Sequence, residues 1–178
     1  INMLARKNDD IQVALMVTNL SRLFRLSLNR GRDVITVREE MMQVTYYLKI
    51  QKFRFEEQLD WNINFDDEIL EYRMLKFIMQ PLVENAIYHG IKSKNEYGKL
   101  AIRGYKDKNM LIFVIEDTGK GMDEDTLTKL YQKINEKKRD EKENRGYGIW
   151  NVNQRIKLFY GEQYGLQIDS IVDKGTSI

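Results

Sequence analysis

Residues 80–90 have the sequence Gln80-Pro81-Leu82-Val83-Glu84-Asn85-Ala86-Ile87-Tyr88-His89-Gly90. This segment places a short amide, Asn85, among the apolar positions of a predicted helix. An amide oxygen can ligate a hard cation. The segment therefore predicts a helix that carries a metal-binding polar group.

Two further segments complete a pattern. Residues 116–122, Glu116-Asp117-Thr118-Gly119-Lys120-Gly121-Met122, end an apolar strand predicted at 111–115. Asp117 can accept a hydrogen bond from an exocyclic amine, and Gly119 and Gly121 let the backbone approach a ligand closely. The triplet Gly146-Tyr147-Gly148 then precedes a helix predicted to begin near Ile149, where free amides and the positive end of the helix dipole can face phosphate. Together the three segments predict an ATP site.

In this order and spacing, the three segments resemble the GHKL ATP-binding superfamily of gyrase-type topoisomerases, a heat-shock chaperone family, histidine kinases and mismatch-repair ATPases. Residues 80–90 and 146–152 are similar to the LytS/YesM type of bacterial sensor histidine kinase. The resemblance covers residues 65–178 strongly and the preceding helical region more weakly. It implies an α+β fold, a two-layer α/β sandwich of the GHKL (Bergerat) kind, preceded by an α-helical hairpin.

The composition narrows the class of partner. The chain has 29 basic and 27 acidic residues, a net charge of +2 and no cysteine. Because the charges are mixed along the sequence, we expect no nucleic-acid surface. Apolar runs are shorter than a bilayer span requires. The chain starts with Ile1, so we expect an excised part of a longer protein. The resemblance implies that it is the cytoplasmic portion of a membrane-embedded bacterial protein.

Residues 1–57 are predicted to form the helical hairpin. Its first helix has apolar residues at three- and four-residue steps: Val13, Met16, Val17, Leu20, Leu23, Phe24 and Leu28. A capping box, Thr36-Val37-Arg38-Glu39, announces the second helix, whose apolar positions are Val37, Met41, Val44 and Leu48. The hairpin either packs on the nucleotide domain or pairs with a second copy, and the resemblance favours a homodimer.

Residues 58–178 are predicted to form the ATP-binding domain. Alternating residues predict a strand at 59–65, and a helix is expected at 70–89 with a kink or restart at Pro81. Strands at 100–105 and 111–115 are joined by a hairpin turn at 107–109. Helices follow at 122–134 and 149–160, a last full strand at 164–171 and the start of another at 175–178. The polar tract 135–145 is interpreted as a lid over the nucleotide.

The resemblance implies a role for each site residue. Asn85 would hold Mg²⁺ together with the triphosphate, and its neighbour Glu84 would help with metal-bound water. In gyrase-like relatives a base lies four residues before the asparagine, whereas here that position is Pro81. This departure favours a kinase over a gyrase-like ATPase.

The remaining residues are assigned to the nucleotide in the same way. Asp117 would select adenine, and the Thr176 hydroxyl would support that carboxylate through water. His89, four residues after Asn85, would contact a phosphate. Tyr88 replaces a cation found in many relatives, and Arg145, directly before Gly146, would supply the missing charge.

The predicted function is the ATP-binding catalytic domain of a sensor histidine kinase with part of its dimerisation helices. The family reaction moves the ATP γ-phosphoryl group to a histidine outside this chain and then to an aspartate of a response regulator. Two alternatives stay open: another GHKL ATPase or anti-sigma-type serine kinase, and a nonenzymatic dimerising module with a nucleotide fold.

Overall fold

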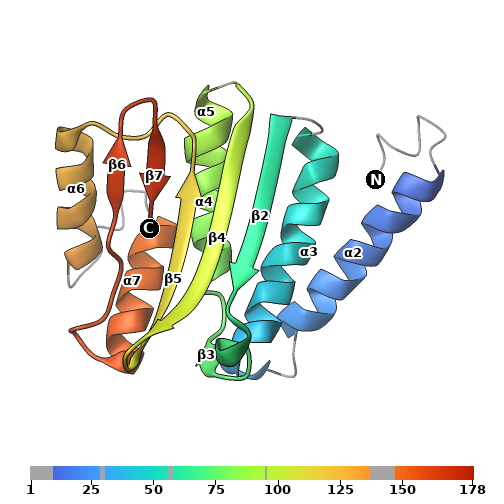
Figure 1. Ribbon diagram of the computed structural model, residues 1–178, viewed down its shortest axis with the longest axis horizontal. Helices are drawn as coiled ribbons and strands as arrows, with labels where there is room; N and C mark the ends of the chain where they lie inside the picture. The colour runs from blue at the N-terminus through green and yellow to red at the C-terminus, as the bar shows by residue number, and fades with distance from the viewer. Residues whose placement is uncertain (1–9, 29–30, 56–57, 95, 137–146) are drawn as a thin grey trace.

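The computed structural model describes residues 10–28, 31–55, 58–94, 96–136 and 147–178 (Figure 1). Its helices are α2 (Asp10–Leu28), α3 (Val37–Phe55), η3 (Asp67–Ile69), α4 (Met79–Asn85), η4 (Ala86–Ile91), α5 (Lys92–Lys94), α6 (Glu124–Asn135) and α7 (Tyr147–Tyr160). Its strands are β1 (Val34–Thr36), β2 (Leu59–Phe65), β3 (Arg73–Leu75), β4 (Gly98–Asp107), β5 (Met110–Asp117), β6 (Asp169–Ile171) and β7 (Gly175–Ser177).

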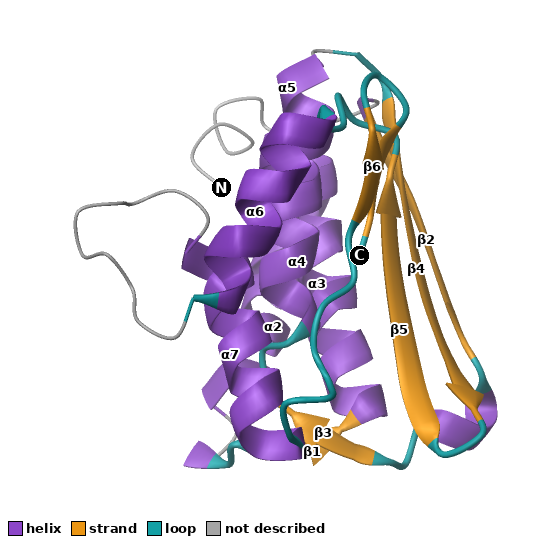
Figure 2. Ribbon diagram, turned by 90° about the vertical axis from the view of Figure 1, so that its left-hand side faces the viewer, coloured by secondary structure: helices purple, strands orange, loops and turns teal. Residues whose placement is uncertain are grey.

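The main architecture is one sheet with helices on one face. The sheet has the strand order β2-β4-β5-β7-β6, with β2 parallel to β4 and the other neighbours antiparallel. Figure 2 shows the long helices together on one side of this sheet, with the short η3 at the end of β2. The structure therefore confirms the predicted α+β two-layer sandwich.

The predicted hairpin is present as α2 and α3, which pack against each other (Figure 1). The capping box at the start of α3 is confirmed. The Thr36 amide donates to a Glu39 carboxylate oxygen at 2.9 Å, and the Glu39 amide donates to the Thr36 hydroxyl at 3.1 Å. These two bonds satisfy amides that the start of a helix leaves without partners.

The alternation predicted for 59–65 is confirmed in β2. Leu59 is buried, whereas Asp60, Asn62 and Asn64 are exposed. Inward side chains of β2, β4 and β5 pack on the helices and form one core. Helix α3 contributes to this same core through Val37, Val44, Tyr47 and Leu48. The apolar interior is therefore continuous across the predicted boundary at residue 57.

The helix predicted at 70–89 is wrong in its first half. Residues 73–75 form β3, which pairs antiparallel with β1, and α4 begins only at Met79. Pro81 lies in the first turn of α4, where its missing N–H is not needed. The helix therefore starts two residues before Pro81, in place of the kink or restart expected there. The helix then continues as the π-helix η4, which the sequence did not predict.

A buried carboxylate from α3 organises the start of α4. Glu40 is fully buried, and its two oxygens accept from the backbone amides of Phe77, Ile78 and Met79 at 2.9–3.0 Å. Burial raises the pKa of Glu40, while these three amides act in the opposite direction. From α7, Arg155 donates to carbonyl oxygens of the same turn at 2.7 and 3.2 Å. The bonds hold a turn in which Phe77 has a φ of 59°.

The last predicted strand is also shorter than expected, because only residues 169–171 join the sheet. The preceding backbone bonds to side chains instead. The Leu166 amide donates to Asn153 Oδ1 at 2.9 Å, and the Ile168 amide donates to the Tyr131 hydroxyl at 2.6 Å. The start of a strand predicted at 175–178 is confirmed as β7. Most of the predicted lid, residues 137–145, lies outside the described residues.

We predict that Glu40→Gln destabilises the chain by about 1–3 kcal/mol, because the new amide group turns a donor toward buried N–H groups. Urea unfolding followed by circular dichroism measures this change. Glu71→Gln is the matched control. Its carboxylate is largely exposed and pairs with Arg38, so the expected loss is below about 0.5 kcal/mol. Equal effects of the two substitutions would contradict the capping role.

Candidate functional site

Asp117 is the buried acid of the site. It ends β5 with 8% of its surface exposed, and its Oδ1 accepts from the Gly119 amide at 2.7 Å. The Thr176 amide also bonds to this carboxyl group. Burial raises the pKa of Asp117 to about 6, while the two amides act to lower it. A carboxylate held in this way is ready to accept one further hydrogen bond.

Glycine backbones enclose Asp117 closely. A Cβ at Gly90 would lie 2.5 Å from Asp117 Oδ1, and a Cβ at Gly119 would lie 2.2 Å from the Gly90 carbonyl carbon. The Lys120 amide also donates to the Gly90 carbonyl at 3.3 Å. The end of η4 and the loop after β5 are thus in direct backbone contact, which no larger residue would allow.

Gly121 also has a conformational reason to be glycine. Its φ is +61°, and a Cβ there would lie 1.9 Å from the Ile171 carbonyl oxygen. Both glycines predicted after Asp117 are therefore explained by their surroundings.

Asn85 ends α4 with its amide group oriented. Its Nδ2 donates to the Pro81 carbonyl at 2.7 Å, which leaves Oδ1 as the atom for a ligand. A Cβ placed at Gly148 would lie 3.5 Å from Asn85 Nδ2, so the start of α7 lies beside this amide. An oxygen ligand next to backbone amides at a helix start fits a magnesium–phosphate group.

Glu84 points to a different neighbourhood from Asn85. Its Oε1 accepts from Gln80 Nε2 at 3.0 Å, and Gln80 Oε1 accepts from the buried Gln43 of α3 at 3.3 Å. Gln43 Nε2 also donates to the Ser27 hydroxyl of α2 at 3.1 Å. Side-chain hydrogen bonds therefore connect both hairpin helices with Glu84. The charge of Glu84 also raises the pKa of Tyr47, after the larger effect of burial.

Tyr88 is not brought together with the other predicted residues. Its hydroxyl accepts from Arg54 Nη1 at 2.8 Å and donates to Gln51 Oε1 at 3.3 Å, and its ring meets Phe55 edge to face. All three partners belong to α3. His89, the next residue of η4, is exposed. The π-helix thus directs adjacent side chains to a helix contact and to solvent.

Ser170 is a site residue that the sequence analysis missed. Its hydroxyl lies 2.9 Å from the Thr176 hydroxyl, accepts from the Met122 amide at 2.9 Å and donates to the Gly175 carbonyl at 3.0 Å. Thr176 is thus held beside Asp117 by its own amide and by Ser170. A lone serine between Asp169 and Ile171 gives no signal that could have revealed this role.

The structure describes only part of the segment that leads into α7. Arg145 and Gly146 lie outside the described residues, and Tyr147 is placed only as the first residue of α7. Side chains of α7 bond to the last turn of α6 and to the residue after it. Trp150 Nε1 donates to the Glu136 carbonyl at 3.1 Å, and Asn153 Nδ2 donates to the Ile134 carbonyl at 2.8 Å.

The site belongs to a known class of ATPase. Residues 71–178 match the family model described as histidine kinase-, DNA gyrase B- and HSP90-like ATPase. The chain is a member of this family. Residues 1–59 match a second model, described as histidine kinase. The two matches divide the chain between the hairpin and the sheet domain.

Relatives of this ATPase chain are sensor kinases. It is 37% identical over 178 residues to the sensor histidine kinase YesM of Bacillus subtilis, covering 100% of this chain and 29% of YesM. It is 30% identical over 172 residues to the sensor histidine kinase BtsS of Escherichia coli, covering 97% of this chain and 28% of BtsS. The sensor protein LytS of Oceanobacillus iheyensis is 32% identical over 166 residues, covering 92% of this chain and 28% of LytS. The chain spans less than a third of each relative.

Solved structures support the fold. The Acinetobacter baumannii histidine kinase AdeS superposes with a TM-score of 0.56 at 17% identity, covering 98% of this chain and 80% of AdeS. The mycobacterial sensor histidine kinase MprB superposes with a TM-score of 0.53 at 14% identity, covering 81% of this chain and 91% of MprB. At these identities the similarity establishes the ATPase fold alone.

We predict that affinity for an ATP analogue falls as the pH is lowered through about 6, the pKa of Asp117 in the free protein. Protonation removes the negative acceptor, so binding at pH 5 should be about tenfold weaker than at pH 7. Calorimetric titration across this range measures the change.

The control is Asp117→Asn, which has no proton to gain. It should bind about 10- to 100-fold more weakly at pH 7 and lack the step near pH 6. A pH step of equal size in the variant would assign the titration to another group.

Proposed function

We propose that this chain is the ATP-binding catalytic domain of a bacterial sensor histidine kinase, with part of the dimerisation region attached. One observation carries the proposal: the buried Asp117 carboxylate is enclosed by glycine backbones in contact with the helix that bears Asn85. Membership of the ATPase family and the names of the relatives support it.

In this proposal Asp117 recognises adenine. Its carboxylate accepts a hydrogen bond from the adenine amino group. Guanine presents a carbonyl oxygen at the same place, so a buried acceptor would face another acceptor and reject it. Thr176, fixed by Ser170, supports the carboxylate from β7.

The phosphates and Mg²⁺ would lie between α4 and the start of α7. Asn85 Oδ1 would hold the metal, and the amides of Tyr147 and Gly148 would bind phosphate oxygens. Arg145 and Gly146, which lie outside the described residues, would supply a positive charge and a further amide. His89 would reach the phosphates from η4. We assign no role at the metal to Glu84, because its Oε1 is bonded to Gln80 and it points to a different neighbourhood from Asn85. We assign no phosphate contact to Tyr88, because its hydroxyl is bonded to Gln51 and Arg54.

The proposed reaction has two transfers. A histidine nitrogen outside this chain attacks the γ-phosphorus, a P–N bond forms, and the bridging P–O bond breaks to release ADP. The phosphoryl group then passes to an aspartate carboxylate of a response regulator. Within this chain the only histidine is His89, which lies in the proposed nucleotide site.

The hairpin offers a surface for a homodimer. Val17, Phe24 and Leu28 of α2 are 44%, 58% and 73% exposed, and their spacing places them on one helix face. The other apolar positions of the predicted stripe, such as Leu20 and Leu23, turn toward the protein. We propose that a second copy covers this exposed face.

We also propose that the parent is a cell-membrane protein and that this chain is its cytoplasmic part. Among the helices that the structure describes, none has the length and apolar character to cross a bilayer.

Asn85→Ala should remove the Mg²⁺-dependent part of ATP-analogue binding while changing stability by no more than about 1 kcal/mol. Titrations with and without Mg²⁺, together with urea unfolding, separate the two effects. Asn62→Ala, on the exposed outer face of β2, is the matched control. A variant that unfolds early yet keeps its Mg²⁺-dependent affinity would refute the metal role.

The whole proposal is tested by labelling with γ-labelled ATP and Mg²⁺. This chain should bind the nucleotide but take up no acid-labile label, because His89 cannot readily attack in line from within the site. The longer parent protein should become labelled on a histidine, and His89→Gln in that protein should at most weaken ATP binding. Stoichiometric label on His89, or failure of this chain to bind ATP, would overturn the proposal.

A further inference from the structure

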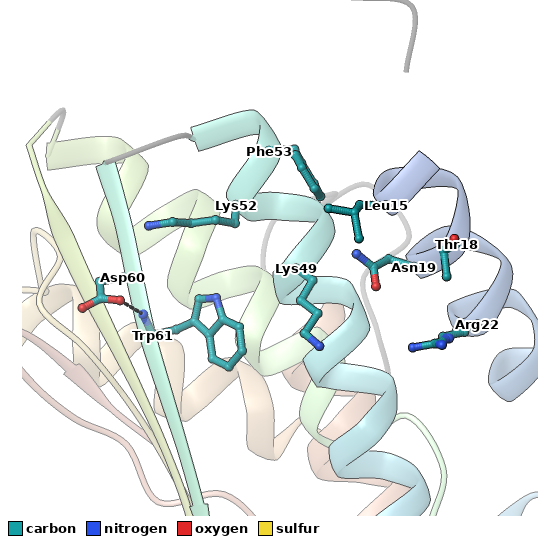
Figure 3. Close-up of a pocket in the computed structure, with 9 residues that line it drawn as sticks. All are labelled: Leu15, Thr18, Asn19, Arg22, Lys49, Lys52, Phe53, Asp60 and Trp61. Carbon is teal, nitrogen blue, oxygen red and sulfur yellow. Dashed lines mark hydrogen bonds between the residues drawn. The ribbon is translucent and has the colours of Figure 1, made fainter. Parts of the chain in front are cut away.

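A cavity of about 610 Å³ lies between α2, α3 and the start of β2 (Figure 3). Its volume is in the range of small-molecule sites in proteins. None of its lining residues belongs to the proposed nucleotide site. Three features of the lining indicate what it binds.

The first feature is Asn19 of α2. This side chain is 8% exposed, and none of the described residues forms a hydrogen bond with it. Figure 3 shows its amide directed toward α3, into the space between the helices. Neither of its amide atoms is a fully buried unsatisfied atom, so both keep some contact with solvent, and a ligand in the cavity could replace water there.

The second feature is a pair of cations. Arg22 and Lys49 both line the cavity and approach the ring of Tyr46, at 5.5 and 5.7 Å from its centroid. Neither has a carboxylate partner in the described part of the chain. Two like charges gathered at one ring repel each other, and an anion between them would relieve that repulsion.

The other charged lining residues are engaged elsewhere. Lys52 donates to the Leu59 carbonyl at 2.6 Å. The Asp60 carboxylate accepts from the Trp61 amide at 3.0 Å and from the Tyr97 hydroxyl at 3.2 Å. These bonds orient the two groups but leave their charges in place, so the lining carries three cations and one carboxylate and its net charge is positive.

The third feature is apolar. Trp61 of β2, Phe53 of α3 and Leu15 of α2 line the same space, and Leu15 is 51% exposed. Figure 3 shows the Trp61 indole beside Lys49, on the β2 side of α3, and Phe53 and Leu15 pointing toward each other between α3 and α2. Flat aromatic ligands pack well on such side chains.

We propose that this cavity binds a small aromatic carboxylate. The ligand's ring lies against Trp61 and Phe53, its carboxylate lies between Arg22 and Lys49, and Asn19 donates a hydrogen bond to one carboxylate oxygen. Such a ligand joins both hairpin helices to the edge strand of the sheet. This proposal does not depend on the proposed kinase function.

The test is calorimetric titration of the chain with 2-naphthoate, with neutral 2-naphthamide as the shape-matched comparison. We expect a dissociation constant of about 1 mM or below for 2-naphthoate and at least about tenfold weaker binding of the amide. Saturation with an ATP analogue should leave the affinity for 2-naphthoate unchanged.

Variants locate the site. Arg22→Gln and Lys49→Gln should each weaken 2-naphthoate binding about tenfold, and both side chains are exposed enough for the fold to tolerate the change. Arg103→Gln, on the outer face of β4, is the control and should bind as the unaltered chain does. The chain has two tryptophans, so the indole N–H signal of Trp61 should shift on binding while that of Trp150 stays in place.

Four results would overturn the proposal. They are absence of binding at millimolar 2-naphthoate, equal binding of 2-naphthamide, unchanged affinity in both cavity variants, and displacement by the ATP analogue. The last would place the ligand in the nucleotide site. Loss of ATP binding alone would refute the proposed function and leave this cavity unaffected.

Discussion

The Glu40 carboxylate, bound to three backbone amides at the start of α4, is the interaction on which the arrangement of the site depends. It comes from α3, so the hairpin and α4 share a buried hydrogen-bond system. The cap sets where α4 begins, and six residues later Asn85 ends that helix. Arg155 joins α7 to the same turn and so relates both sides of the proposed phosphate site. A charge buried this deeply is stable only while all its partners stay in place.

Local patterns predicted much of this structure. The capping box of α3 and the alternation of β2 each depend on neighbouring residues, and both were confirmed. The three nucleotide segments also lie together as expected, with Gly119 against Gly90 and Gly148 beside Asn85. The start of α4 could not be predicted, because its hydrogen-bond acceptor is almost forty residues away. In sequence, Glu40 is one more charge in an acidic first turn of a helix.

The sequence also could not predict the directions in which side chains point. Sequence placed Glu84, Asn85, Tyr88 and His89 in one segment, but a helix turns successive residues to different faces. Tyr88 bonds directly to α3, and Glu84 is linked to α3 through Gln80. Asn85 instead lies beside α7. The π-helix adds a further change of register after Ala86. The same segment therefore serves the proposed nucleotide site on one side and the hairpin on the other.

Because Glu40 of α3 caps the start of α4, the hairpin cannot be cut away without affecting the rest of the protein. A piece that begins at residue 71, where the ATPase match begins, would keep β4, β5, β6, β7, α4 and α7. It would lose β2 and leave three amides at the start of α4 without an acceptor. It would also lose β1, the partner of β3, and part of the shared core. The shortest piece that keeps β1 and the acceptor for the start of α4 must therefore begin before Val34. In covalent order α3 belongs to the hairpin, but in folding it is part of the ATP-binding unit.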